Sequence, residues 1–93
     1  MDSILEADIV ISTAGREKGK PFLVYVVEGN EVLLIDGKYR RLENPKRKNV
    51  KHVRFVQRSD TRVAQKIRAG EHITNSEVRK ALAAYLEAQT PAL

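Results

Sequence analysis

The chain has 93 residues, of which 42% are hydrophobic and 31% are charged, and its formal net charge is +5 at neutral pH. This length and composition predict one small globular domain, and the net positive charge favours an anionic partner. The sequence has no cysteine, which excludes disulfides, thiolate metal sites and a cysteine nucleophile.

The N-terminal half is expected to be β-structure. Residues 7–13 are rich in Ile and Val and predict a first strand. Residues 14–20 form a turn region in which Gly15 and Gly19 bracket a charged tripeptide. Residues 22–28 are almost entirely apolar, which predicts a strand buried on both faces. Alternation assigns one face to Phe22, Val24 and Val26 and the other to Leu23, Tyr25 and Val27.

A hairpin is expected next, around Asp36-Gly37. Residues 32–35 predict a third strand after a turn at Gly29-Asn30. The Asp36-Gly37 dipeptide favours a two-residue turn between strands. Residues 39–42 are therefore expected to return as a fourth strand.

The strand pattern is interrupted at Asn44-Pro45, and residues 46–49 predict a polar, basic connection. Residues 50–56 then alternate, with Val53 and Phe55 expected toward the core and basic side chains outward. Short strands joined by tight turns favour a small barrel, because closure removes most exposed sheet edges.

The last third of the chain predicts two helices. Asp60 is expected to cap the first helix, which ends at Gly70. Residues 74–77 have the form of a capping box, and Ile73 and Val78 stand at the spacing of a hydrophobic staple. We expect the helical pair to cover the outer face of the second strand. Its second member carries an apolar stripe of Val78, Ala81, Leu82, Tyr85 and Leu86, in which Tyr85 belongs to the core.

The positive charge is concentrated in residues 38–58. Nine of these 21 residues are Lys or Arg and Glu43 is the one acidic residue, whereas the remainder of the chain has eight basic and eleven acidic residues. A concentrated basic segment attracts polyanions, and a phosphate backbone is the first candidate. Any one of these side chains is better explained as solvated surface, and it is their clustering that favours binding.

Residues 15–20, with the sequence Gly-Arg-Glu-Lys-Gly-Lys between two predicted strands, resemble a KOW motif. The resemblance continues through Asp36-Gly37, Arg41-Leu42, the stretch 44–48 and Lys51-His52. In these features the chain is similar to small bacterial KOW-domain RNA-binding proteins, which are related to the L14e-type large-subunit ribosomal proteins.

The resemblance covers residues 7–58 and implies both a fold and a function. The implied fold is a small SH3-like β-barrel of about five strands in residues 1–58. Residues 59–93 are then a C-terminal helical extension packed on the barrel as one folding unit. The implied function is RNA binding in translation, with structured ribosomal RNA as the expected ligand of a ribosomal or ribosome-associated protein.

The expected binding residues come from the glycine-bracketed loop and from the basic segment. Gly15 and Gly19 allow backbone amides to approach a phosphate. Base or sugar contacts are expected from Tyr39 and His52, although packing at a barrel end explains Tyr39 and an exposed strand position explains His52 equally well. Phosphate contacts are expected from Arg16, Lys18, Lys20, Lys38, Arg40, Arg41, Lys46, Arg47, Lys48, Lys51 and Arg54.

No enzymatic activity, metal, cofactor or small-molecule substrate is expected. The two histidines are not at metal-ligand spacing, the acidic residues are scattered, and no phosphate-binding or nucleophile motif is present in the sequence. The acidic N-terminus lacks the features of a signal peptide, and no apolar run is long enough to span a bilayer. These observations predict a cytoplasmic protein without a membrane partner.

Two other functions stay open. A protein-interaction module that docks on ribosomal proteins or the transcription machinery would use the apolar stripe Val78, Leu82, Tyr85 and Leu86, provided that the barrel does not bury it. Nonspecific DNA binding would use the same cations, because phosphate contacts carry no sequence information and no preference for RNA.

Overall fold

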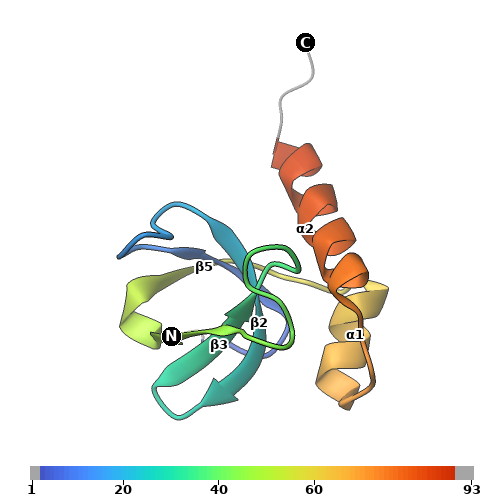
Figure 1. Cartoon of the computed structure of the whole chain (residues 1–93), viewed down its shortest axis with the longest axis horizontal. Coiled ribbons are helices and arrows are strands. Elements are labelled where there is room, and N and C mark those ends of the chain that lie inside the picture. The colour runs from blue at the N-terminus through green and yellow to red at the C-terminus, as the bar shows by residue number, and fades with distance from the viewer. Residues whose placement is uncertain (1–2, 90–93) are drawn as a thin grey trace.

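The computed structural model describes residues 3–89, which form a five-stranded antiparallel sheet followed by two helices (Figure 1). The strands are β1 (Asp8–Ser12), β2 (Pro21–Glu28), β3 (Glu31–Ile35), β4 (Lys46–Asn49) and β5 (Val53–Arg58). A short 3-10 helix, η1 (Val50–His52), precedes β5, and the helices are α1 (Arg62–Ala69) and α2 (Asn75–Gln89). The expected bounds 1–58 and 59–93 extend at both ends past the described residues.

The strand order is β4-β3-β2-β1-β5, which places the apolar β1 and β2 inside the sheet and the basic β4 at one edge. Within residues 3–89, β4 and β5 each have one strand neighbour and are not paired with each other. A backbone hydrogen bond of 2.8 Å from Val50 to Asn30 links η1 to the turn between β2 and β3. The expectation of a mainly β fold with C-terminal helices is confirmed.

The sheet separates two clusters of buried side chains. On the face toward the helices, Ile9, Leu23 and Ile35 pack against buried residues of both helices. The helical contribution consists of Val63, Ala64, Ile67, Val78, Leu82 and Tyr85. On the other face, the cluster is Val10, Phe22, Val24, Val32 and Leu34. The helical pair therefore covers the outer side of β2, as the two apolar faces of that strand predict.

A bulge in β2 changes the alternation predicted for its second half. The pairing with β3 shifts register between Val24 and Val26. Tyr25 packs toward the helices, whereas Val27 packs on the other face with Val24. The assignment of Val27 to the face of Leu23 was wrong, because an extra residue in one strand reverses the side-chain alternation beyond it.

The helix ends follow local sequence signals closely. The cap of α1 is Thr61, whose Oγ1 accepts a hydrogen bond of 3.2 Å from the amide of Ala64, so the assignment of this role to Asp60 was wrong by one residue. Gly70 ends the helix with a φ of 72°. The predicted capping box is confirmed, since the amide of Glu77 donates to Thr74 Oγ1 at 3.1 Å and the amide of Thr74 donates to Glu77 Oε1 at 3.0 Å.

The two helices are also joined by an ion pair of 3.0 Å between Lys66 Nζ and Glu77 Oε2, which holds the pKa of Glu77 below its ordinary value. In the part of the chain that the structure describes, no helix combines the length and hydropathy needed to cross a bilayer.

The fourth strand is β4, at the residues 46–49 that were predicted to be a connection, and the prediction of a strand at residues 39–42 was wrong as well. The Oδ1 atom of Asp36 accepts hydrogen bonds from the amides of Lys38 at 2.9 Å and Arg40 at 2.7 Å, and the Asp36 amide donates to the Arg40 carbonyl at 2.9 Å. These bonds close a compact loop in place of a two-residue hairpin. The chain returns to β3 only at β4, where Lys46 pairs with Leu34.

Phe55 is 36% exposed, and its assignment to the core was also wrong. The pairing of β1 with β5 shifts register between Ile9 and Val10, which disturbs the alternation along β5. Val53 still packs against the cluster that contains Val10. The Phe55 ring lies 5.5 Å from the guanidinium carbon of Arg58.

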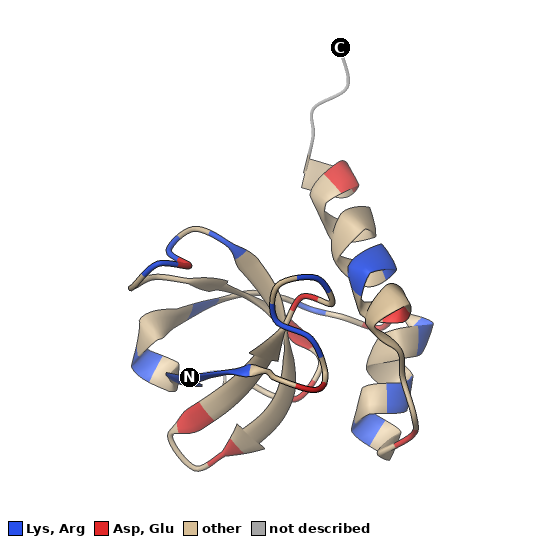
Figure 2. Ribbon diagram, in the orientation of Figure 1, with Lys and Arg blue, Asp and Glu red and all other residues tan. Residues whose placement is uncertain are grey.

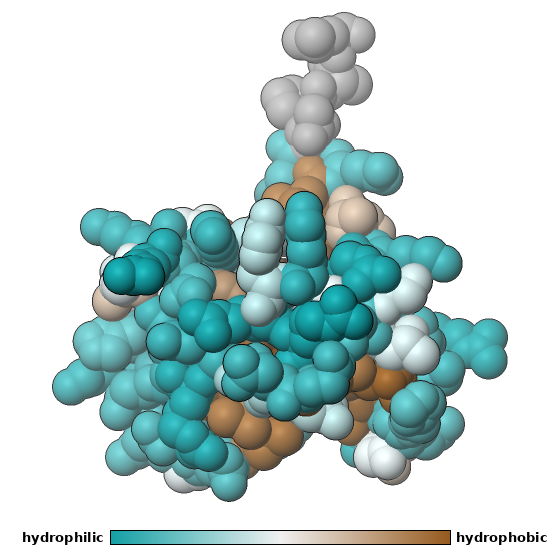
Figure 3. Space-filling view, in the orientation of Figure 1, coloured by the Kyte–Doolittle hydropathy of each residue, from teal (hydrophilic) through white to brown (hydrophobic). Residues whose placement is uncertain are grey.

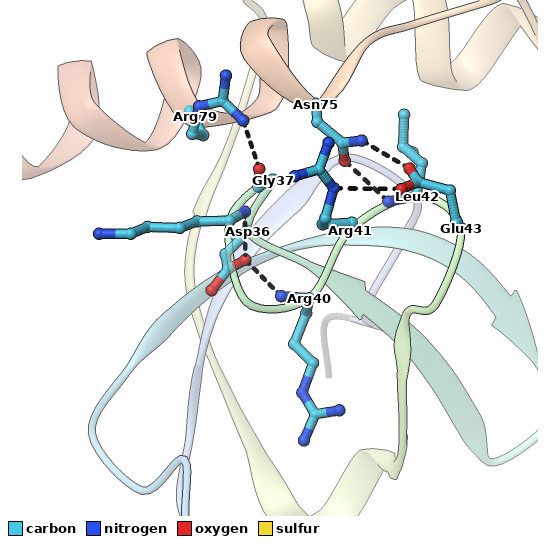
Figure 4. Close-up of polar contacts among 9 residues, drawn as sticks. Asp36, Gly37, Arg40, Arg41, Leu42, Glu43, Asn75 and Arg79 are labelled. Carbon is cyan, nitrogen blue, oxygen red and sulfur yellow. Dashed lines mark hydrogen bonds and ion pairs between the residues drawn. The ribbon is translucent and has the colours of Figure 1, made fainter.

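Residues 36–44, hereafter the Tyr39 loop, dock on the first turns of α2 (Figure 4). The carbonyl of Gly37 accepts a hydrogen bond of 2.6 Å from Arg79 Nη1. The amide of Leu42 donates to Asn75 Oδ1 at 2.8 Å, and Asn75 Nδ2 donates to Glu43 Oε1 at 2.6 Å. The bond from Asn75 lowers the pKa of the Glu43 carboxyl. Two side chains of α2 therefore hold both ends of this loop.

Gly37 sits where the loop and the helix touch. Its φ is +79°, and a Cβ atom placed there would collide with the Asn75 carbonyl oxygen and lie 2.9 Å from Arg79 Cγ. Gly29 has a comparable φ of +61°, but a Cβ atom there would meet nothing within 4 Å. A side chain at either glycine would strain the backbone, but only a side chain at Gly37 would also clash with α2.

We predict that Gly37→Ala lowers the free energy of unfolding by roughly 3 kcal/mol, because left-handed strain adds to a collision with backbone. Gly29→Ala is the matched control and is expected to cost about 1 kcal/mol from strain alone. Urea denaturation followed by circular dichroism measures both. Equal losses for the two variants would contradict the docking of the loop on α2.

Candidate nucleic-acid interface

Residues 13–20, hereafter the basic loop, connect β1 to β2 in a closed turn. The Ser12 amide donates to the Lys20 carbonyl at 3.1 Å, and the Gly19 amide donates back to the Ser12 carbonyl at 2.8 Å. Gly15 and Gly19 both have positive φ, at 77° and 88°. The amides of Lys18, Gly19 and Lys20 are used within the turn, so side chains rather than these amides are offered to a ligand. Those exposed side chains are Arg16, Lys18 and Lys20.

An ion pair joins the basic loop to the Tyr39 loop. Glu17 Oε2 lies 2.7 Å from Arg40 Nη2 and 3.2 Å from Arg40 Nε. The hydrogen bonds from Arg40 hold the pKa of Glu17 below its ordinary value, and the charges of Lys46 and Lys48 act in the same direction. Lys48 Nζ also donates a hydrogen bond to the carbonyl of Ala14. Arg40 and Lys48 therefore hold the loop in place.

The 3-10 helix η1 lies on the other side of the basic loop. The amide of Thr13 donates to the carbonyl of His52 at 2.8 Å. Lys51 and His52 are both exposed. The basic loop is therefore flanked by two other segments with basic side chains, the Tyr39 loop and η1. Figure 2 shows Lys and Arg along the loop that joins β1 to β2, whereas Asp and Glu stand at the end of the β2–β3 hairpin.

Tyr39 is the most exposed large hydrophobic residue in the described part of the chain, at 72%. Lys38 Nζ lies 5.1 Å from the centre of its ring and Lys20 Nζ lies 5.5 Å from it. Lys38 belongs to the Tyr39 loop, and Lys20 belongs to the basic loop. The two loops therefore meet at a flat aromatic ring with an ammonium group from each.

A groove of about 320 Å³ opens between the Tyr39 loop and α2. Its α2 wall is formed by Leu82, Ala83 and Leu86, with Arg79 at one end, and Tyr39 and Pro21 lie on the side of the loop and β2. Figure 3 shows a mostly hydrophilic face, with hydrophobic residues near the C-terminal part of α2 and in separate patches lower on the face. The groove thus combines an apolar wall with a cationic rim.

Three of the sequence-predicted cations are engaged in ion pairs. Arg40 pairs with Glu17, and Arg41 Nε lies 3.1 Å from Glu43 Oε2. Arg47 Nη1 lies 3.2 Å from both Glu28 and Glu31, and these carboxylates raise the Arg47 pKa. Within residues 3–89, no ion pair engages Arg16, Lys18, Lys20, Lys38, Lys46, Lys48, Lys51 or Arg54.

Arg54 lies apart from the basic loop along β5. It lines a second groove, of about 830 Å³, together with Phe55, Leu5 and Val27. The structure therefore brings together the exposed residues of what we call the basic surface, around the basic loop: Arg16, Lys18, Lys20, Lys38, Lys51, Tyr39 and His52. Arg40, Lys46 and Lys48 are half-buried beside Glu17 or the loop backbone. Arg41, Arg47 and Arg54 lie outside this surface.

Sequence reasoning did not assign a role in this surface to three residues that support it, Glu17, Asp36 and Arg79. Glu17 orients Arg40, Asp36 shapes the Tyr39 loop, and Arg79 anchors Gly37. One sequence feature could have indicated the role of Glu17, since it is an acidic residue between two basic ones, Arg16 and Lys18. Among residues 3–89, no group of three His, Asp or Glu side chains is arranged to hold a metal ion.

Neither a comparison with protein-family models nor a search of curated proteins returns a match for this chain.

We predict that Glu17→Gln lowers the free energy of unfolding by about 1 kcal/mol at neutral pH, because it breaks the ion pair with Arg40. The folded-state pKa of Glu17 lies below its unfolded value. The contribution of the ion pair to the free energy of unfolding is therefore fully present above the unfolded-state pKa of about 4.3. It is lost as the pH falls through the folded-state pKa of Glu17. Chemical denaturation of the wild type and Glu17→Gln between pH 7 and pH 3 should show the two curves converging at low pH.

Glu71→Gln is the control, since Glu71 is exposed and, in the described residues, is in no ion pair. It should follow the wild type throughout. A constant gap between the Glu17→Gln and wild-type curves at every pH would contradict a charge-dependent role for Glu17.

Proposed function

We propose that this protein binds RNA through the basic surface. The observation that carries the proposal is the convergence of five exposed cations, none of them in an ion pair within residues 3–89, on one region of the fold. They are Arg16, Lys18, Lys20, Lys38 and Lys51.

The arrangement of these cations supports a polyanion rather than a single small anion as ligand. Lys20 of the basic loop shares the Tyr39 ring with Lys38, and the backbone of the same loop bonds to His52, which follows Lys51 in η1. A surface of this kind follows a phosphate backbone over several nucleotides. The exposed Tyr39 and His52 add flat rings on which unpaired bases stack, which favours RNA with loops or bulges over regular duplex.

The fold is consistent with this function. We propose that the five strands form an SH3-like barrel of the KOW type. In this barrel, η1 closes the gap between the edge strands β4 and β5, and its Val50 amide bonds to Asn30. The KOW-like residues 15–20 then occupy the loop that such proteins use for RNA. With the resemblance to small KOW-domain proteins, this makes structured ribosomal RNA the proposed ligand and a ribosome-associated role in the cytoplasm the proposed setting.

The other functions receive less support. A protein-interaction module was expected to use Val78, Leu82, Tyr85 and Leu86, but the first three are buried against the sheet and only Leu86 is half exposed. DNA binding would use the same cations, and competition between RNA and duplex DNA of equal length distinguishes it.

We predict that affinity for single-stranded RNA depends steeply on salt. If the five cations neutralise about five phosphates, log K falls with log salt at a slope of roughly −3.5. Fluorescence anisotropy with a labelled ribosomal RNA fragment, between 50 and 300 mM KCl, measures the slope. A salt-independent affinity, or no binding to any RNA, would refute the proposal.

A matched pair of substitutions tests which surface binds. Arg16→Gln should weaken RNA binding and reduce the magnitude of the salt slope by about 0.7, the contribution of one phosphate. Arg47→Gln removes the same charge from an arginine paired with Glu28 and Glu31, and should leave the slope unchanged. If Arg47→Gln weakened RNA binding more than Arg16→Gln, the RNA would contact β4 at Arg47 rather than the basic loop.

A further inference from the structure

The groove between the Tyr39 loop and α2 has the features of a pocket for one nucleotide. It has a volume of about 320 Å³ and an apolar wall on α2. Tyr39 closes the opposite side, and Lys20 and Lys38 stand at the rim within 5.5 Å of its ring centre. An aromatic face beside an apolar wall accepts a flat base, and ammonium groups at the rim accept its phosphates.

The Tyr39 ring is mounted on a loop that is ordered before any ligand arrives. Asp36 Oδ1 holds the amides of Lys38 and Arg40, and Arg79 holds the carbonyl of Gly37. The residues on both sides of Tyr39 are therefore fixed by hydrogen bonds. Binding to such a platform loses little backbone entropy, which favours a stacked ligand.

Asp36 supplies a polar group to the same groove. Both hydrogen bonds that its carboxylate accepts within residues 3–89 use Oδ1. The second carboxylate oxygen points away from the loop (Figure 4) and has no hydrogen-bond partner within residues 3–89. A carboxylate oxygen accepts hydrogen bonds only, so it selects a base that presents an amino group.

We propose that this groove binds a single unpaired nucleotide of the RNA, with a base that carries an exocyclic amino group (adenine, cytosine or guanine) stacked against Tyr39. The base amino group donates to Asp36 Oδ2, and the flanking phosphates contact Lys20 and Lys38. Uracil is disfavoured because it has no exocyclic amino group, and its N3–H donor lies between two carbonyl oxygens that repel the carboxylate. This inference rests on the proposed RNA binding and adds a base preference to it.

The groove itself is tested with Tyr39→Ala and Tyr39→Phe in the full chain. Because the side chain is 72% exposed, neither change should disturb folding. Tyr39→Ala should weaken binding of a labelled adenine oligonucleotide by about ten-fold, and Tyr39→Phe should retain affinity because stacking survives. The salt slope should stay the same in both variants, since no phosphate contact is removed.

The base preference is tested with Asp36→Asn. Asparagine keeps the acceptor Oδ1 that shapes the loop and replaces Oδ2 by an NH2 donor. The wild type should bind adenine and cytosine oligonucleotides more tightly than uracil ones, and Asp36→Asn should abolish or invert this order. Amide spectra of the 15N-labelled chain titrated with AMP, CMP and UMP should show shifts in residues 37–40 and 82–86.

The outcomes separate the two proposals. Absence of RNA binding in the wild type overturns the proposed function and this inference together. Salt-dependent binding that Tyr39→Ala leaves unchanged, or nucleotide-induced shifts confined to β5 and the groove at Phe55, overturns the nucleotide pocket alone. Equal affinity of the wild type for all three oligonucleotides overturns the base preference.

Discussion

The docking of the Tyr39 loop on α2 is the contact on which the arrangement of the molecule depends. Gly37 is buried against the helix, Arg79 donates to its carbonyl, and Asn75 bonds to both Leu42 and Glu43. These bonds connect a helix that packs on one face of the sheet to the loop that carries Tyr39. They also decide the path of the chain after β3, because a loop held on α2 cannot continue as a hairpin strand. The position of β4 and the groove beside Tyr39 both follow.

A second set of contacts connects the two loops of the basic surface. Glu17 is the internal counter-ion of this region, since it pairs with Arg40 and lies within the field of Lys46 and Lys48. Without it, the cations brought together here would repel one another in the free protein. The cost of gathering positive charge is thus partly offset by one carboxylate, while the outermost lysines and Arg16 remain available to an anionic ligand.

Sequence patterns predicted the elements that are determined locally and failed where distant contacts decide. The capping box at residues 74–77 and the end of α1 at Gly70 depend on neighbouring residues and were predicted. Asp36-Gly37 carries a strong local hairpin signal, but its outcome is decided by Arg79 and Asn75, more than 30 residues away. The positions of Val27 and Phe55 depend on register shifts that leave no pattern in the sequence. The basic residues were identifiable, whereas their division into paired and unpaired cations required the positions of the glutamates.

The placement of β4 at the sheet edge has a consequence for association between copies of the chain. An edge strand presents unsatisfied backbone groups to which another copy could add a strand. Here that strand is Lys46, Arg47, Lys48 and Asn49, three cations in succession. A second copy approaching edge to edge would bring like charges together at the 4.7–4.9 Å spacing of neighbouring strands. The positive charge of β4 therefore opposes the addition of a second copy at this edge of the sheet.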